Sequence, residues 1–553
     1  MRFSVNKLYL SLLSAGIYIL LYLYILPDIL ILRSDDFGYL QSFLSSLKQN
    51  RLVTSNFLEP YSYFSTIVSI GLFKITGNLY VSTFGSVAFF ALVNFYLILY
   101  MLISRFNLKI SILTALFLST FPVYLNISAD MTGIMATWAL FLAAVILFQR
   151  GKYFWYAIFT MLAISNRQSS IVLLVFPLYD LIKIYISRKR IDLQFIYLIF
   201  FITGMSFFIF LKSPLTAAAR ISYELNLKSF EVLFSPAKLF SIITGLFSFI
   251  FIFTALITVL SPYQLKPNFR NNLKFFHLPV AAGILLLIQF LFSGDFIRFQ
   301  TPLFNEMKYG TIYLKILFFL SVWFFPWSKL RISSFAVTGL FYILMISLRV
   351  IWYDYYLWEI VILGLFYLLS NKNIFPAETK SPGKKLNYII PVTLLLFNII
   401  YSIYFKIYLD KNALSLFVHE KLLRQNKITV TDISDAPFGY IGWKLFNLIY
   451  KDYPDRETTY FLCQVRQSGY DIIIKPLDTL RDSRDDRIVD QGFYRIGPEF
   501  KKYYVVKNDF HKNKRDNCNQ YEDNQKLNPD KYPNIIFPLN NREWREFLSK
   551  STT

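Results

Sequence analysis

The sequence predicts an all-α polytopic membrane protein followed by a small α/β domain. The 553-residue chain is 55% hydrophobic and 19% aromatic, and its mean hydropathy is +0.43. A soluble globular chain is rarely so apolar. Apolar runs of about 20 residues recur along residues 1–408, and each is long enough to cross a bilayer. Residues 409–553 lack such runs, so we expect two domains, 1–408 and 409–553.

Run length and hydrophobic periodicity predict about thirteen membrane-spanning helices. The N-terminal apolar run is too long for a signal peptide and no small-x-small cleavage site follows it, so we interpret it as a retained first span. The expected limits of the spans are 8–32, 79–103, 110–128, 131–149, 153–166, 169–186, 193–211, 239–260, 278–293, 311–327, 332–348, 356–370 and 388–408.

Positive charge follows every second span. The net charge of +22 lies mostly in short loops, and this positive-inside pattern orients helices rather than indicating a nucleic-acid partner. The basic loops contain Arg105 and Lys109, Arg150 and Lys152, residues 187–190, Lys266, Arg270 and Lys274, Lys329 and Arg331, and residues 372–385. The N-terminus is therefore expected in the cytoplasm. An odd number of spans then puts the C-terminal domain on the extracytoplasmic side of a bacterial inner membrane or of the endoplasmic reticulum.

After residue 409, long apolar runs give way to shorter segments in which apolar and polar residues alternate. Alternating apolar residues predict strands over 427–433, 460–465, 470–477 and 503–509, and residues 440–453 are typical of a helix. Both cysteines, Cys463 and Cys518, lie here. In an extracytoplasmic domain they form either a disulfide or two unpaired thiols, and their spacing does not decide between these.

Two adjacent acids, Asp35 and Asp36, follow the first span and open the outer loop 33–78. One interpretation is a helix start, with Ser34 as the N-cap and both acids in the first turn, where they suit the helix dipole. The other is a functional pair where membrane meets water. Asp130 lies at a tight outer corner between two expected spans, and it too is either an N-cap or a functional acid.

The order of these features resembles the GT-C membrane glycosyltransferases. The first span is followed by an acidic pair, a flat amphipathic helix, the stretch "EPYSYF" at 59–64, and a pair of spans with an acid at its outer corner. This order is most similar to the protein O-mannosyltransferase and aminoarabinose (lipid A) transferase branch. Asp36 stands where that branch usually has Glu, and a single proline, Pro60, stands where it often has two.

The resemblance implies a hexosyl- or pentosyltransferase whose donor is a sugar on a polyprenyl phosphate. The acceptor hydroxyl belongs to a glycan, a lipid or a protein. Asp35 is the candidate general base for the acceptor proton. Asp36 orients the acceptor, or both acids hold a divalent cation such as Mg²⁺ or Mn²⁺, although two carboxylates are too few to specify a metal site. No other cofactor is expected.

Positive charge is needed to hold the donor phosphate. Arg167, at an outer corner, and Arg349, before the span 356–370, are the main candidates, and Arg298 and Lys308 are further ones. Asp130, Asp354 and Tyr355 are candidate contacts for the substrates. The alternatives are that Arg167 reaches the lipid headgroups and that the tyrosines form an interfacial aromatic belt.

Two other classes of membrane protein compete with this interpretation. A transporter or lipid flippase would have ionisable residues near mid-span, broken helices and an internal repeat, whereas the expected spans are nearly free of charge. A glycan polymerase or ligase of the cell envelope would also keep its charges outside. No P-loop, Gly-x-Ser-x-Gly or His-Glu-x-x-His motif occurs, and three histidines make a histidine metal cluster improbable.

Overall fold

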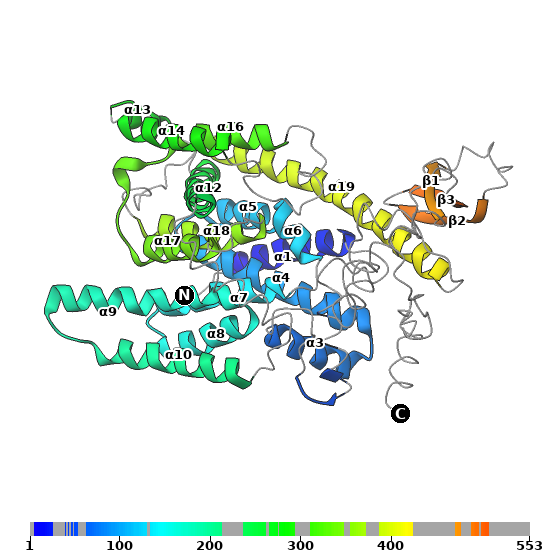
Figure 1. Ribbon diagram of the computed structural model, residues 1–553, viewed down its shortest axis with the longest axis horizontal. Coiled ribbons are helices and arrows are strands. Elements are labelled where there is room, and N and C mark those ends of the chain that lie inside the picture. The colour runs from blue at the N-terminus through cyan, green and yellow to red at the C-terminus, as the bar shows by residue number, and fades with distance from the viewer. Residues whose placement is uncertain are drawn as a thin grey trace, which may run out of the picture.

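The computed structural model of the chain is mostly helical within the residues that it describes (Figure 1). Isolated positions between residues 39 and 52 are also described. The described ranges are 5–25, 62–129, 133–212, 236–260, 265–274, 276–292, 310–347, 354–371, 386–423, 470–476, 488–496 and 499–507.

A helix lies at the position of every expected span. The helices are α1 (Val5–Ile25), α3 (Tyr63–Thr76), α4 (Leu79–Ile103), α5 (Leu108–Ser119), α6 (Pro122–Ser128), α7 (Ile134–Gln149), α8 (Tyr153–Asn166), α9 (Val175–Arg188), α10 (Leu193–Lys212), α12 (Pro236–Leu260), α13 (Leu265–Lys274), α14 (His277–Phe292), α16 (Gly310–Phe324), α17 (Ser334–Ser347), α18 (Leu357–Ser370) and α19 (Leu386–Leu423). Three 3₁₀ segments join them, η1 (Gln168–Leu174), η3 (Trp327–Lys329) and η4 (Asp354–Tyr356).

Some of the expected spans are not simple helices. The span expected at 110–128 is the pair α5 and α6, bent by 61°, because Pro122 has no N–H to continue α5 and instead begins α6. The span expected at 169–186 begins as η1 before it becomes α9. Helix α19 continues past residue 408 to Leu423 and contains Pro391.

Four described helical segments are long and apolar enough to cross a membrane: Leu79–Ile103, Gln168–Arg188, Lys238–Leu260 and Ile389–Asp410. Two bent pairs raise this number to six if each pair is one span, and further apolar helices are shorter. These helices agree with a membrane-embedded helical protein. The number of thirteen spans stays a prediction.

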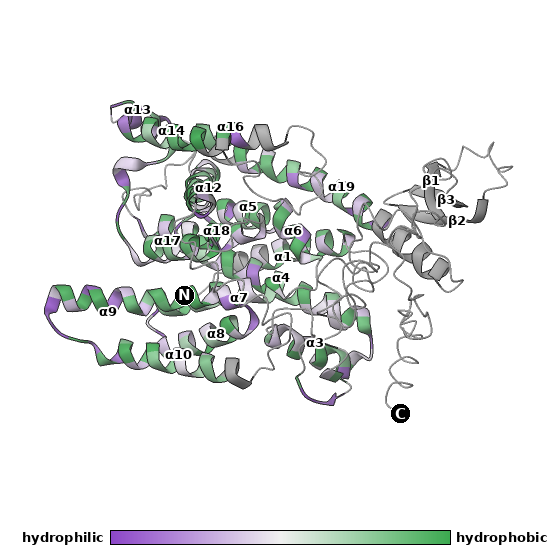
Figure 2. Cartoon of the chain, in the orientation of Figure 1, coloured by the Kyte–Doolittle hydropathy of each residue, from purple (hydrophilic) through white to green (hydrophobic). Residues whose placement is uncertain are grey.

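The helix ends divide between two sides of the molecule. Figure 1 shows α13 and the turn between α9 and α10 towards the left, whereas α3 and the far end of α19 lie towards the right. Hydrophobic residues follow the helices, and hydrophilic residues gather in the turn between α9 and α10 and in α13 (Figure 2). That turn and α13 belong to the basic loops of the sequence.

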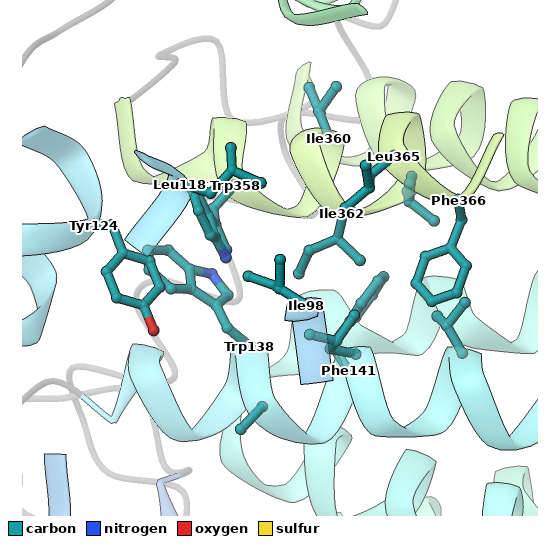
Figure 3. Close-up of a cluster of buried hydrophobic side chains, with 14 of the residues drawn as sticks. Ile98, Leu118, Tyr124, Trp138, Phe141, Trp358, Ile360, Ile362, Leu365 and Phe366 are labelled. Carbon is teal, nitrogen blue, oxygen red and sulfur yellow. The ribbon is translucent and has the colours of Figure 1, made fainter. Parts of the chain in front are cut away.

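Large aromatic side chains fill the centre of the bundle. Trp138 of α7 and Trp358 of α18 have ring centroids 5.3 Å apart, and Tyr124 of α6 lies 4.8 Å from Trp358. Figure 3 shows these three rings against one another, beside the aliphatic side chains Ile98 and Leu118. The packing fixes the start of α18 against α6 and α7.

Three antiparallel strands follow α19 in the chain and form a sheet in the order β1–β3–β2. They are β1 (Tyr470–Pro476), β2 (Ile488–Ile496) and β3 (Glu499–Lys507). The strand expected at 470–477 coincides with β1, the strand expected at 503–509 overlaps β3, and β2 was not expected. The expected strands 427–433 and 460–465, the helix 440–453 and both cysteines lie outside the described residues, so the α/β domain stays a prediction.

Asn166, the last residue of α8, joins three helices. Its Nδ2 donates to the carbonyl oxygen of Gly133 and to Oγ1 of Thr137, both at 2.7 Å, and its Oδ1 accepts from the backbone N–H of Ser65 at 3.1 Å. Gly133 has a φ of +69°, and a Cβ added there would lie 2.7 Å from Oγ of Ser65. The starts of α3 and α7 therefore meet the end of α8 at a position that favours glycine.

Gly133→Ala is expected to destabilise the protein, because it adds a clash to an unfavourable backbone conformation. The expected loss is about 2 kcal/mol or more in the free energy of unfolding. The matched control is Gly151→Ala, at a φ of +67° with open space around the Cβ, which should lose about 1 kcal/mol. Thermal unfolding in detergent measures both. Equal losses for the two variants would show that the junction tolerates a methyl group.

Candidate functional site

The structure describes two of the expected site residues with their side chains, Arg167 and Tyr355. Asp354 is the first residue of η4, but its side chain lies outside the described part of the chain. The remaining candidates also lie outside it: Asp35, Asp36, Asp130, Arg298, Lys308 and Arg349.

The described residues that flank the expected acids meet one another. Tyr22, in the last turn of α1, donates its hydroxyl hydrogen bond to the carbonyl oxygen of Ser128, the last residue of α6. Gly133 meets Asn166 and Ser65 as described above. The end of α1 and the start of α3 flank the loop with Asp35 and Asp36, and Ser128 and Gly133 flank Asp130. These contacts join the end of α1 to the end of α6, and the starts of α3 and α7 to the end of α8.

Arg167 forms the corner between α8 and η1. Its backbone N–H donates to the carbonyl oxygen of Ala163 at 2.8 Å, and its extended conformation, with φ −156° and ψ 125°, ends α8. Its side chain is only 11% exposed. The guanidinium carbon lies 5.0 Å from the ring centroid of Tyr355 and 4.8 Å from that of Tyr356. Such stacking is a cation–π arrangement, and the side chain points into the protein rather than towards lipid headgroups.

Tyr355 and Tyr356 belong to η4, directly before α18. Their ring centroids are 4.5 Å apart, and Tyr356 is buried. The structure thus brings together two residues that the sequence expected in separate outer loops, Arg167 and Tyr355. Tyr356 is not part of an exposed aromatic belt, because its ring is covered.

Glu359, in the first turn of α18, is the acid that faces Arg167. Its side chain is 1% exposed, and its Oε1 lies 3.7 Å from Nη1 of the arginine. This distance is an ion pair but is too long for a hydrogen bond. Tyr342 of α17 and Trp138 of α7 also interact with the carboxylate, although neither meets hydrogen-bond geometry.

Several polar atoms of this cluster lack a hydrogen-bond partner among the described residues. They are both carboxylate oxygens of Glu359, Nη1 of Arg167, the hydroxyl of Tyr342 and the indole nitrogens of Trp138 and Trp358. Buried polar atoms are usually paired with protein or with ordered water. The cluster therefore presents donors and acceptors that a polar ligand group or water molecules can satisfy.

The described residues of the cluster supply one cation, Arg167, which faces the carboxylate of Glu359. The planar guanidinium of arginine can donate two parallel N–H hydrogen bonds to two oxygens of a phosphate or a carboxylate. In the described part of the chain, no three His, Cys, Asp or Glu side chains lie close enough together to hold a metal ion.

Sequence reasoning missed Glu359, Tyr342 and Trp138. The signal for Glu359 was present, since it is the single charged residue in the apolar helix α18, and an ionisable residue in such a segment is a functional candidate. Trp138 and Tyr342 gave no signal, because they lie in apolar helices where aromatic residues are ordinary core.

Removing one member of the ion pair is expected to destabilise the protein more than removing both. Arg167→Leu leaves the Glu359 carboxylate buried without its counter-charge, which should cost about 3 kcal/mol or more. The double variant Arg167→Leu/Glu359→Leu should recover most of that loss. Thermal unfolding of wild type, both single variants and the double variant measures the coupling. Additive single losses would show that the two charges do not interact.

Comparison with protein-family models, curated proteins and solved structures finds no match for this chain. Its function is therefore argued from the residues and their geometry.

Proposed function

We propose that this protein is a membrane glycosyltransferase that moves a sugar from a polyprenyl-phosphate donor to an acceptor hydroxyl. The observation that carries the proposal is the inward-facing Arg167, which lies against Tyr355 and Tyr356. This arginine directly follows Asn166, which bonds to Gly133 and Ser65, and Gly133 is three positions after Asp130 in the chain. A buried cation beside aromatic rings suits a donor that joins a phosphate to a sugar.

The reaction needs one base and one anion site. The sugar's C1–O bond to phosphate breaks, and a C1–O bond to the acceptor forms. Asp35 takes the proton of the acceptor hydroxyl, and the polyprenyl phosphate leaves with the electron pair of the broken bond. Arg167 stabilises the charge that grows on this phosphate. In this proposal, Asp36 and Asp130 orient the acceptor and the sugar.

Tyr355 supplies a surface for the sugar beside the arginine. Its ring is partly exposed, whereas Tyr356 is covered, so Tyr355 is the one that a ligand can reach. Glu359 keeps Arg167 in place before the donor binds. Because their ion pair is 3.7 Å long, without a direct hydrogen bond, a donor phosphate can take up the guanidinium N–H groups without breaking a strong bond.

In this proposal the transfer takes place on the extracytoplasmic face. The basic loops then face the cytoplasm, in agreement with the positive-inside rule. The three-stranded sheet lies beside the far end of α19 (Figure 1).

The test is transfer of radiolabelled sugar from several polyprenyl-phosphate donors to envelope acceptors, in membranes with equal amounts of each variant. Asp35→Asn should lower transfer by about 10²-fold or more, because it removes the general base. Asp192→Asn, in the turn between α9 and α10, is the matched control and should transfer like wild type. Wild-type transfer that survives in Asp35→Asn would show that this acid only begins a helix.

The ion pair gives a second variant with its own control. Arg167→Leu/Glu359→Leu should be folded but should lose about 10²-fold of the transfer rate, since the anion site is gone. The control removes a second buried ion pair of the described residues, Lys406–Asp410 of α19, whose Nζ–Oδ1 distance is 2.9 Å. Lys406→Leu/Asp410→Leu should keep transfer. Equal transfer by both double variants would contradict a role for Arg167.

A transporter or lipid flippase is the second candidate, and two observations favour it. Buried ion pairs join Arg167, at the corner after α8, to Glu359 of α18, and Lys406 to Asp410 within α19, and α5 and α6 form a broken helix. Ionisable residues and broken helices are features of transport pathways. If no donor is consumed while labelled lipid crosses liposomes that contain the protein, the transporter is the correct class.

A further inference from the structure

A cavity of about 470 Å³ lies between α12, α14, α17 and the loop around η3, at the opposite end of α18 from the ion pair. Glu359 is in the first turn of α18, whereas Tyr367, which lines the cavity, is near its end. The volume is within the usual range for a small-molecule site. Its wall is almost wholly apolar, and among the described residues that line it Arg331 is the single charged one.

Hydrogen bonds fix the backbone of residues 329–331 beside the cavity. The hydroxyl of Tyr367 accepts from the N–H of Arg331 at 2.7 Å and donates to its carbonyl oxygen at 2.9 Å. Nδ2 of Asn371 donates to the carbonyl oxygen of Lys329 at 3.2 Å. These bonds hold the segment with Arg331 against the end of α18, so the basic residue keeps its place at the rim.

The neighbouring helix α13 has the features of a helix that lies in the membrane interface. It is bent by 95° from α14, and it carries Lys266, Arg270 and Lys274 beside the exposed apolar residues Phe269 and Leu273. Nδ2 of Asn272 attaches it to the carbonyl oxygens of Trp323 and Phe325, at 2.7 and 2.8 Å. A basic amphipathic helix in this position attracts anionic lipid.

We propose that this cavity binds one acyl chain of an anionic phospholipid, with the lipid phosphate at Arg331. The apolar lining would contact the acyl chain, and the guanidinium of Arg331 would pair with the negatively charged headgroup. A free phosphate has no apolar part to contact the apolar lining of the cavity. A zwitterionic lipid has no net negative charge to pair with Arg331. The site is separate from the Arg167–Glu359 cluster and does not depend on the proposed transferase activity.

The test is native mass spectrometry of the detergent-purified protein after exchange into phosphatidylglycerol or phosphatidylcholine. Wild type should retain phosphatidylglycerol in preference to phosphatidylcholine. Arg331→Gln should reduce that preference by about fivefold, the effect of one basic side chain at an anionic membrane surface. Arg188→Gln, an exposed residue at the end of α9, is the matched control and should keep it.

Binding of the lipid acyl chain is tested separately from binding of the lipid headgroup. Ala336→Phe puts a ring into the cavity and should lower retention of both lipids, with thermal unfolding as the check that the variant folds. In wild type, a phosphatidylglycerol with a photoreactive acyl chain should crosslink to α12, α14 or α17. Crosslinks confined to other helices, or unchanged preference in Arg331→Gln, would overturn the proposal. Equal binding of glycerol phosphate without acyl chains would show a phosphate site only.

Discussion

The fold depends on satisfying backbone carbonyls where helices end or break inside an apolar bundle. A carbonyl that is buried away from water without a hydrogen bond costs about 1–3 kcal/mol. Buried asparagines meet this need repeatedly. Nδ2 of Asn398 on α19 donates to the carbonyl oxygen of Phe117 in the last turn of α5. Nδ2 of Asn272 donates to the carbonyl oxygens of Trp323 and Phe325 at the end of α16. Nδ2 of Asn166 donates to the carbonyl oxygen of Gly133, the residue before α7. Asparagine suits these positions because one short side chain offers two donors and an acceptor.

The same constraint explains where the polar cluster lies. Arg167 and Glu359 are both at helix ends, one directly after α8 and the other in the first turn of α18. A helix end already has unpaired backbone groups and a local change of direction, so a charged side chain can turn inward there without breaking a helix. The aromatic packing of Trp138, Trp358 and Tyr124 then fixes the start of α18, and this positions Tyr355 and Tyr356 over the arginine.

Apolar run length predicted the helices well, because in this chain each long run has polar or basic residues at its ends. It did not predict the bend at Pro122, although the proline is a local signal for it. It also did not predict the 3₁₀ start at η1 or the extension of α19 to Leu423. Of the site, the sequence predicted a corner at Arg167 and named Arg167 and Tyr355 as separate candidates, but their contact comes from the structure. The inward direction of Arg167 did not, because it requires Glu359, and a single acid in an apolar run does not reveal which cation it faces. Asp35, Asp36 and the other outer charged residues stay predictions.

Charge balance links the structural and functional roles of the arginine. A lone guanidinium inside an apolar bundle is costly, so Arg167 needs an anion whether or not a substrate is present. Glu359 supplies that anion at 3.7 Å, and the tyrosine faces add attraction without adding charge. A bound lipid phosphate would offer a second anion with better geometry for the same guanidinium. In the proposed function, that phosphate and the sugar would also pair with the polar atoms of this cluster that lack a hydrogen-bond partner among the described residues.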